Sequence, residues 1–206
     1  ADEAGDIAPA EADLLRLLTS IAKLTTGRQA VEVASEVLEA HGGAGYVEDT
    51  GLPLLLRDSQ VLPIWEGTTN VLALDALRAL AHGDTGLQTL RRKVSDIAAD
   101  ARDAALVGAA RQAEAAVDHA LSWVRDAAAA NRTVLEAGAR RFGLTLGRAL
   151  ALALLVEAAE WSLTHEHDGR ARAAALRFAR TPIDHIAVAD PRLDEALAND
   201  EPLLPA

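Results

Sequence analysis

Residues 11–43 read EADLLRLLTSIAKLTTGRQAVEVASEVLEAHGG and predict a long amphipathic helix with a defined end. Apolar side chains recur there at steps of three and four residues, which places them on one face of an α-helix. They are Leu14, Leu17, Leu18, Ile21, Leu24, Val31, Ala34, Val37 and Leu38. The pattern stops at His41, because Gly42 can adopt the positive φ that closes a helix. We expect a helix from about residue 11 to residue 40.

The composition of the whole chain also favours helices. Half of the 206 residues are apolar, but only 3% are aromatic. Alanine and leucine dominate, and both lose little side-chain freedom in a helix. The β-branched and aromatic clusters that strands need are nearly absent. The sequence therefore predicts an all-α helical bundle, with enough residues for one substantial core or two small ones.

Glycine and proline divide the first half of the chain. Residues 42–65 are rich in both, and we expect an ordered loop there, because its apolar side chains would be costly to leave in water. These side chains are Tyr46, Leu52, Leu54, Leu55, Leu56 and Val61. Thr68 or Thr69 can then cap a helix that continues to about Leu80. The glycines of HGDTG at 82–86 end that helix.

The second half contains long stretches without proline. Helices are expected at about 87–105, 107–130, 132–167 and 170–180. The remaining tail, 181–206, holds four of the seven prolines. We expect this tail to lie over the bundle rather than to add to its core.

Charge and composition limit the classes of partner. The net charge is −11, and both residues 1–82 and residues 83–206 are acidic, so extensive phosphate contacts with nucleic acid are not expected. There is no cysteine, and so no disulfide or thiolate metal site.

The longest uninterrupted apolar run, at 149–156, is too short for the roughly 20 residues of a membrane span. We expect no membrane partner and take the cytoplasm as the default location. The chain has no methionine and opens on a polar stretch, which suggests a piece of a longer protein.

Two motifs could carry binding chemistry. HGGAGY at 41–46 lacks the preceding strand and the glycine spacing of a dinucleotide fingerprint, which leaves a helix end with a tight turn, or a backbone that a ligand approaches. His165 and His167 are two residues apart, so a helix would point them to different faces, and we expect no metal site there. No GxSxG sequence occurs, and hydrolase chemistry has no support.

The stretch VLPIWEGTTN at 61–70 offers two interpretations of Glu66. In the first interpretation, Glu66 is the acid just before a helix, and the partial positive charge of the helix N-terminus favours its negative charge. Alternatively, Ile64 and Trp65 surround its carboxylate with apolar surface, which would suit a general base. Gly67 beside it leaves room for a substrate. The residues alone leave both interpretations open.

Taken together, EVLEAHGGAGYVEDTGLPLLLRDSQVLPIWEGTTNVLALDALRAL at 36–80 resembles the C-terminal helical domain of acyl-CoA dehydrogenases. Three motifs occur in the family's order and spacing: GGAGY, LRDSQV and IWEGTTN. The wording of the last is closest to the long branch that includes the bacterial alkylation-response flavoprotein. The resemblance implies that residues 1–84 are the C-terminal part of the catalytic domain and that 85–206 form an appended helical bundle with its tail.

The family resemblance also implies a flavoprotein oxidoreductase of fatty acid metabolism that works as a homo-oligomer. In the family, FAD accepts hydride from the β-carbon of an acyl-CoA while a carboxylate removes the α-proton, and Glu66 falls on that base in many members. Gly67 falls on a substrate contact, and Arg78 falls near the CoA moiety. The positions that match flavin contacts are Glu39, His41, Gly42, Gly43, Thr68 and Asn70. The family commonly has glutamine at the positions of Glu39 and Asn70, and some members take their base from another helix.

The family's N-terminal helical domain and β-barrel have no counterpart in this sequence. We therefore expect acyl-CoA, FAD and an electron acceptor to bind the whole enzyme, and we do not expect this chain alone to hold FAD or to turn over. The alternative is a non-catalytic helical module for oligomerisation or nucleic-acid contact. The acidic charge of the chain does not favour nucleic acid.

Overall fold

A computed structural model describes residues 7–81, 83–187 and 190–203, and within these ranges all regular structure is helical. This confirms the predicted all-α class. In chain order the α-helices are α1 (Pro9–Ala40), α2 (Gly43–Tyr46), α3 (Leu52–Ser59), α4 (Thr69–Arg78), α5 (Thr85–Asp100), α6 (Ala104–Ala130), α7 (Arg132–His165), α8 (Arg170–Ala179) and α9 (Pro191–Asn199). A short 3-10 helix at Glu48–Thr50 lies between α2 and α3.

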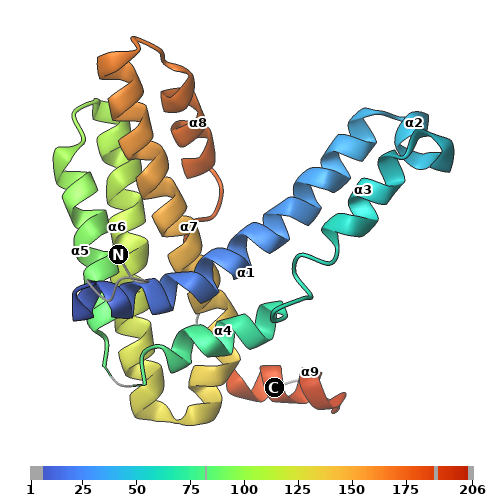
Figure 1. The fold of residues 1–206 in the computed structure, drawn as a ribbon. Helices are drawn as coiled ribbons and strands as arrows, with labels where there is room; N and C mark the ends of the chain where they lie inside the picture. The colour runs from blue at the N-terminus through green and yellow to red at the C-terminus, as the bar shows by residue number, and fades with distance from the viewer. Residues whose placement is uncertain (1–6, 82, 188–189, 204–206) are drawn as a thin grey trace.

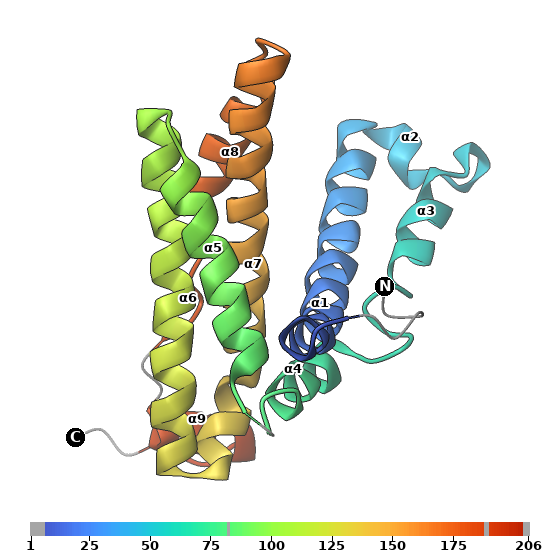
Figure 2. The same ribbon diagram turned by 60° about the vertical axis from the view of Figure 1, so that its left-hand side comes forward.

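The molecule has two visibly different parts (Figure 1). Helices α5, α6 and α7 run side by side with α8 against them, and both views show this bundle (Figure 2). The first half of α1 crosses the bundle, and its second half projects from it with α2 and α3 folded back alongside. We call this projection, residues 28–65, the arm. Helix α4 brings the chain back to the bundle.

One hydrophobic core extends from α1 through α5, α6 and α7 to the segment after α8. Its largest fully buried side chains include Leu17, Ile21, Leu87, Leu90, Leu106, Phe142, Leu146, Leu152 and Ile183. The aromatic pair Trp123 and Phe142, with ring centroids 5.6 Å apart, fills the space between α6 and α7. Close packing there requires glycine, because a Cβ built on Gly138 would lie 2.0 Å from the Trp123 ring.

Helix α7 is 34 residues long and is capped by the preceding residue, Asn131, whose side-chain oxygen accepts from the Val134 N–H at 2.9 Å. By length and composition alone, it contains an 18-residue window apolar enough to cross a membrane, and 56% of that window is buried against the rest of the structure. The uninterrupted apolar run at 149–156 is only part of this helix, in which glycine, threonine and arginine stand among the other apolar residues.

The predicted helix ends hold closely except where α5 ends and α6 begins, because α6 starts at Ala104 rather than near residue 107. Helix α5 stops at Asp100 rather than near residue 105, because Asp103 begins the next helix. The Asp103 carboxylate accepts from the backbone N–H groups of Ala105 and Leu106 at 3.0 and 3.1 Å. An aspartate in that position satisfies N–H groups that have no partner within the helix, and so it fixes the start of α6.

The predicted loop at 42–65 is wrong, because α2, the 3-10 helix and α3 lie there. Gly51, with φ 71°, makes the turn, and Pro53 follows at a position in the first turn of α3 where its missing N–H costs nothing. The expectation that the apolar side chains of this segment are buried is also wrong for this chain. Tyr46 is 85% exposed and Leu55 is 58% exposed.

The tail is only partly as expected. Residues 181–187 lie on the bundle, where Arg148 Nε donates to the Pro182 carbonyl at 2.7 Å and His119 Nδ1 lies 2.5 Å from an Asp184 oxygen. Burial lowers the pKa of Arg148. The helix α9 beyond them was not predicted. A short nine-residue helix with a proline at its first position gives little periodic signal.

Candidate functional site

The turn that carries Glu66 has an unusual backbone. Trp65 N–H and Ile64 N–H both donate to the Val61 carbonyl, at 3.0 and 2.9 Å. Glu66 then has a φ of 56°, and Gly67 has a φ of 120°. A positive φ is uncommon for residues other than glycine, and such strain concentrates at functional positions.

Glycine at position 67 is required for two reasons. Its φ of 120° is strained for any residue with a side chain. In addition, a Cβ built there would lie 3.0 Å from Leu72 Cδ2, on the helix that follows the turn. The turn therefore enters α4 in close contact with it. Thr68 is the residue just before α4, but its hydroxyl does not cap the helix.

Helix α1 contacts the turn from the other side. Lys23 Nζ donates a hydrogen bond to the Leu62 carbonyl, and the same nitrogen lies 5.9 Å from the centroid of the Trp65 ring. One helical turn later, a Cβ built on Gly27 would lie 3.1 Å from the Leu62 carbonyl oxygen. The backbone of α1 and the turn are thus almost in contact at Gly27.

Asp75 fastens α4 to α1. Both of its oxygens accept from Arg16 at 2.7 Å, and Ser20 Oγ donates to one of them at 2.5 Å. The hydrogen bond from the Arg16 guanidinium, followed by that from Ser20, lowers the pKa of Asp75. Arg78 lies 4.0 Å from the same carboxylate. Arg78 is therefore the more distant of the two cationic partners of Asp75.

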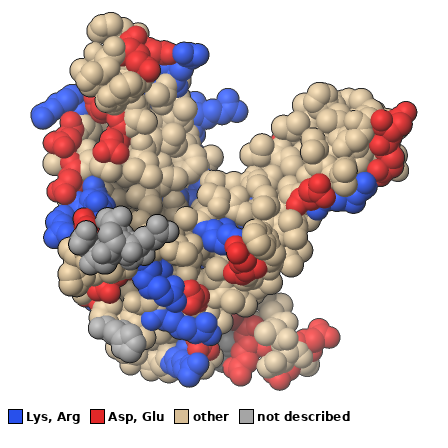
Figure 3. Space-filling model, viewed as in Figure 1, with Lys and Arg blue, Asp and Glu red and all other residues tan. Residues whose placement is uncertain are grey.

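The apolar enclosure that the sequence predicted around Glu66 is not formed by this chain. Glu66 is exposed, and Ile64 and Trp65 are 58% and 52% exposed. The reason is the position of the turn, which lies at the base of the arm and outside the bundle (Figure 1). Much of the arm is uncharged in Figure 3, with acidic side chains at its tip and charged side chains of both signs along its lower edge.

The predicted flavin-binding residues form two separate groups. Glu39, His41, Gly42 and Gly43 lie at the tip of the arm, where Gly42 has a φ of 58° and a Cβ built on either glycine would meet nothing within 4 Å. Thr68 and Asn70 lie at the start of α4. The 15 residue steps from Gly27, which contacts the turn, to Gly42 correspond to about 22 Å of helix. The structure does not bring the two groups together.

Arg78 lies on the wall of a cavity of about 500 Å³ between α4 and the connection from α6 to α7. Leu74, Leu77, Val124 and Leu135 give it apolar walls. Its other charged residues are Asp84, Arg125, Arg132 and Glu136, of which Arg125 pairs with Asp84 at 3.2 Å and Arg132 with Glu136 at 2.6 Å. A neighbouring cavity of about 430 Å³ includes Asn70 and Arg140. Sequence reasoning missed the walls from α6 and α7, because no local motif marks them.

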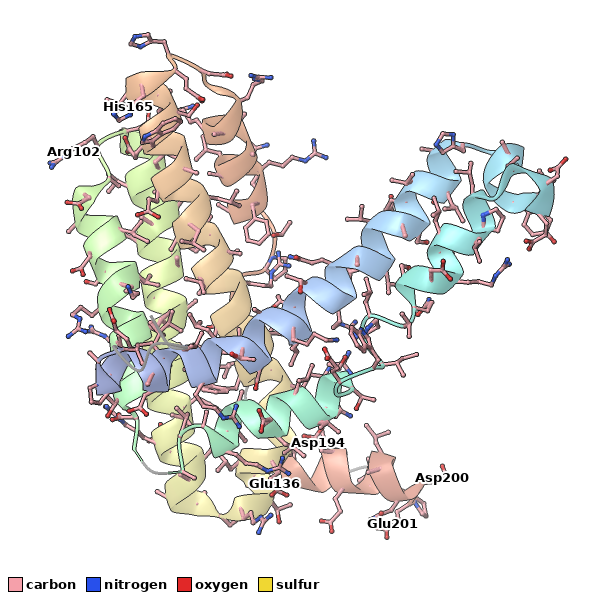
Figure 4. The ribbon with its side chains drawn as sticks, in the orientation of Figure 1. Arg102, Glu136, His165, Asp194, Asp200 and Glu201 are labelled. Atoms are coloured by element: carbon pink, nitrogen blue, oxygen red, sulfur yellow. The ribbon has the colours of Figure 1, made fainter. Side chains whose placement is uncertain are left out.

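The histidines of HEH lie far from this site. His165 is at the opposite end of the bundle from Glu136 (Figure 4). Its ring stacks on Trp161 with centroids 5.1 Å apart, and its Nδ1 lies 2.9 Å from the Trp161 carbonyl. Within the described ranges, no group of three or more metal-ligating side chains is placed to hold an ion.

Comparison with known protein families gives two matches. Residues 4–81 match the family described as acyl-CoA dehydrogenase, C-terminal domain. Residues 86–201, more than half of the chain, match the family described as acyl-CoA dehydrogenase 11 C-terminal domain-like. Each predicted site residue lies within the first of these regions.

Individual relatives agree with the family matches. The chain is 39% identical to acyl-CoA dehydrogenase family member 11 of Caenorhabditis elegans over 81% of its own length and 28% of the relative's. It is 39% identical to 3-methylmercaptopropionyl-CoA dehydrogenase of Ruegeria pomeroyi over 54% of its own length and 19% of the relative's. The crystal structure of C. elegans ACDH-11 in complex with C11-CoA superposes with a TM-score of 0.84 at 33% identity, covering 97% of this chain and 35% of that one. The chain thus spans about a third or less of these proteins.

Proposed function

The chain belongs to the acyl-CoA dehydrogenase family, and we propose that it acts as the C-terminal part of an FAD-dependent enzyme that oxidises an acyl-CoA thioester between its α and β carbons. The observation that carries this proposal is the strained turn at Glu66 and Gly67, with φ angles of 56° and 120°. A carboxylate held in a conformation that costs on the order of 1–3 kcal/mol, and held there by contacts with another helix, is typical of a functional residue.

In the proposed reaction, the Glu66 carboxylate accepts the α-proton of the thioester. Thr68 and Asn70 would hold FAD beside this carboxylate, and FAD would supply the acceptor for the β-hydrogen, which leaves as hydride. A carbon–carbon double bond would form, and the two electrons would pass on to an electron acceptor. Gly67 lets the substrate approach the carboxylate closely.

We propose that parts of the enzyme outside this chain complete the site. Proton removal from carbon requires base and substrate to be held together in a site from which water is excluded. Ile64 and Trp65 offer an exposed apolar surface next to Glu66. The chain covers only 28% and 35% of two relatives. In an enzyme of that length, a further part of the protein would cover the apolar surface of Ile64 and Trp65.

The separation of the two predicted flavin-binding groups supports a homo-oligomer. We propose that Thr68 and Asn70 contact the flavin of the active site of Glu66, whereas Gly42 and Gly43 reach the flavin of another subunit. The open space beside both glycines fits the approach of a bound group to the backbone. The exposed apolar residues of the arm give the contact surface that such an assembly needs.

Arg78 has a proposed role in substrate binding. Its guanidinium has its nearest carboxylate, on Asp75, at 4.0 Å, and it lies at a cavity large enough for part of a nucleotide. Arginine is well suited to phosphate oxygens, because it donates several hydrogen bonds in one plane. We propose that it contacts the phosphorylated end of the CoA moiety.

The test is Glu66→Gln in the whole enzyme, which keeps the size of the side chain and removes the base. We expect flavin absorbance to be retained and turnover of acyl-CoA to be lost, with Glu157→Gln, an exposed carboxylate on α7 of the bundle, as the matched control. Turnover by the Glu66→Gln enzyme at the parental rate would contradict the proposal.

A non-catalytic module for oligomerisation is the second candidate, and the exposed arm is the observation that favours it. Under that function, the arm would assemble the chain and Glu66 would have no chemical role. The two candidates differ in the outcome of Glu66→Gln, because only the catalytic one predicts a loss of turnover. A role in nucleic-acid contact is not supported by the net charge of −11.

A further inference from the structure

The conformation of Glu66 depends on contacts made four residues earlier. The Leu62 carbonyl is the point at which the turn is attached to the rest of the molecule, since both Lys23 Nζ and the backbone near Gly27 meet it. Pro63 follows directly, and its ring fixes φ near −65°. A displacement of Leu62 is therefore carried to Glu66 through a short and stiff segment.

Helix α1 is a rigid base for this attachment. Lys23 lies between Ile21 and Leu24, which are 1% and 2% exposed, so its backbone is held in the core while its side chain reaches toward the turn. Lys23 and Gly27 are four residues apart and share one face of the helix. The lysine supplies attraction at the place where the glycine allows close approach.

The ammonium group of Lys23 serves two partners at once. It donates to the Leu62 carbonyl, and it lies over the Trp65 ring at 5.9 Å, within the range of a cation–π contact. Leu62 and Trp65 are the first and last parts of the segment that leads into Glu66. Holding both restricts the segment more than either contact alone would.

We propose that Lys23 is a positioning residue, which fixes the turn at Leu62 and Trp65 and thereby sets the place of the Glu66 carboxylate. The inference rests on the proposed function of Glu66 as the base. Lys23 itself touches neither substrate nor flavin in this proposal. Its effect is on where the carboxylate stands, and a misplacement of about 1 Å can cost about 100-fold in rate.

The experiment compares Lys23→Met, Lys23→Arg and Lys93→Met in the whole enzyme. Methionine keeps an unbranched side chain but removes the charge and the donor, whereas arginine keeps both. Lys93 is exposed on α5 and gives the matched control for loss of a lysine. We expect Lys23→Met to lower kcat about tenfold or more with KM within about twofold, Lys23→Arg to restore most of kcat, and Lys93→Met to match the parent.

A second readout does not depend on activity. In a ¹H–¹⁵N spectrum of this chain, we expect Lys23→Met to shift the indole N–H signal of Trp65, identified with Trp65→Phe, and to leave those of Trp123 and Trp161 in place. Lys93→Met should shift none of the three. An unchanged Trp65 signal in Lys23→Met overturns the inference, because the contact that carries it would be absent.

The outcomes separate the two proposals. If Glu66→Gln abolishes turnover but Lys23→Met keeps the parental kcat, the inference fails and the proposed function stands. If Glu66→Gln turns over normally, the proposed function fails and the catalytic part of the inference fails with it. A loss of kcat in Lys23→Met that Lys23→Arg does not reduce also overturns the inference, because the charge and the donor would then not be what matters.

Discussion

The bundle and the arm have similar apolar content, but the bundle buries its large apolar side chains and the arm exposes many of them. In the bundle, Phe142 and Leu146 are fully buried, whereas in the arm Tyr46, Leu55 and Ile64 are more than half exposed. The other exposed large apolar residues of the arm are Val33, Val37, Val47, Leu54, Val61, Leu62 and Trp65. The bundle is stabilised by its own packing, and the arm presents a surface that suits contact with another part or copy of the protein. The site turn with Glu66 lies where the two parts meet.

The sharpest test of this difference substitutes one large side chain in each part. Phe142→Ala leaves a cavity in the core, and we expect it to lower the free energy of unfolding by about 3–5 kcal/mol. Tyr46→Ala removes a side chain that is 85% exposed, and we expect a change within about 0.5 kcal/mol. Urea denaturation of this chain followed by circular dichroism measures both. Similar losses for the two variants would break the comparison.

Self-association of the whole enzyme should be more sensitive to a substitution in the arm than to one in the bundle. Leu55→Asp places a charge on the exposed surface of the arm, and we expect it to weaken self-association of the whole enzyme by at least tenfold, because a buried unpaired charge is costly at an interface. Light scattering over a range of concentrations gives the oligomeric state. As the control, Leu154→Asp alters an exposed leucine of α7 in the bundle. Equal weakening by both would show that the arm is not the main contact.

The attachment of α4 to α1 gives a smaller, pH-dependent effect. The folded pKa of Asp75 lies below its unfolded value, so the Arg16–Asp75 pair contributes stability above about pH 4, and this contribution is lost as pH falls through the lower folded pKa. With side chains 49% and 27% exposed, solvent screens the pair, and we expect Asp75→Asn to cost about 1 kcal/mol at pH 7. Urea denaturation at pH 7 and near pH 2 should show the cost at the first and not at the second. A cost that is the same at both pH values would contradict the assignment.

The least effect is expected from a charge pair on the arm itself. Arg57 binds both oxygens of Glu48 at 2.8 and 3.0 Å, and the pair lies in solvent. Exposed ion pairs contribute little, because water and salt screen them. Arg57→Gln should leave the urea midpoint of this chain unchanged within error, at low salt and at 1 M salt alike. A clear loss at low salt would mean that the arm has more internal stability than its exposed surface suggests.

Local periodicity was sufficient to predict the long helices. The apolar stripe of α1 and the proline-free stretches of α6 and α7 each extend over many turns, so their ends fall within about three residues of prediction. The segment at 42–65 was mispredicted for a specific reason. The cost of leaving its leucines in water predicts that they are buried within a loop of the same chain, but Leu54 and Leu55 lie on helical surface that this chain does not cover.

In the candidate site, too, local sequence signals could be predicted, but contacts between distant residues could not. The dipeptide Glu66–Gly67 could be found from sequence, because a carboxylate followed by glycine is a local signal. Lys23 could not, because its contact with Leu62 joins residues 39 positions apart and depends on how α1 packs against the turn. The division of the chain at residue 84 stays a prediction. The walls of the Arg78 cavity come from helices on the far side of that division.

Helix α1 has a consequence for attempts to make a smaller protein. At 32 residues it is one rod of about 48 Å, with Leu17 and Ile21 in the core shared with α5 and α7 and its other half in the arm. A chain cut after residue 84 would keep the strained turn and lose the partners that bury these two side chains. The position at which two family descriptions meet is therefore a poor place to divide the gene. An engineer who wants the turn of Glu66 in isolation has to redesign one face of α1 as a water-facing surface.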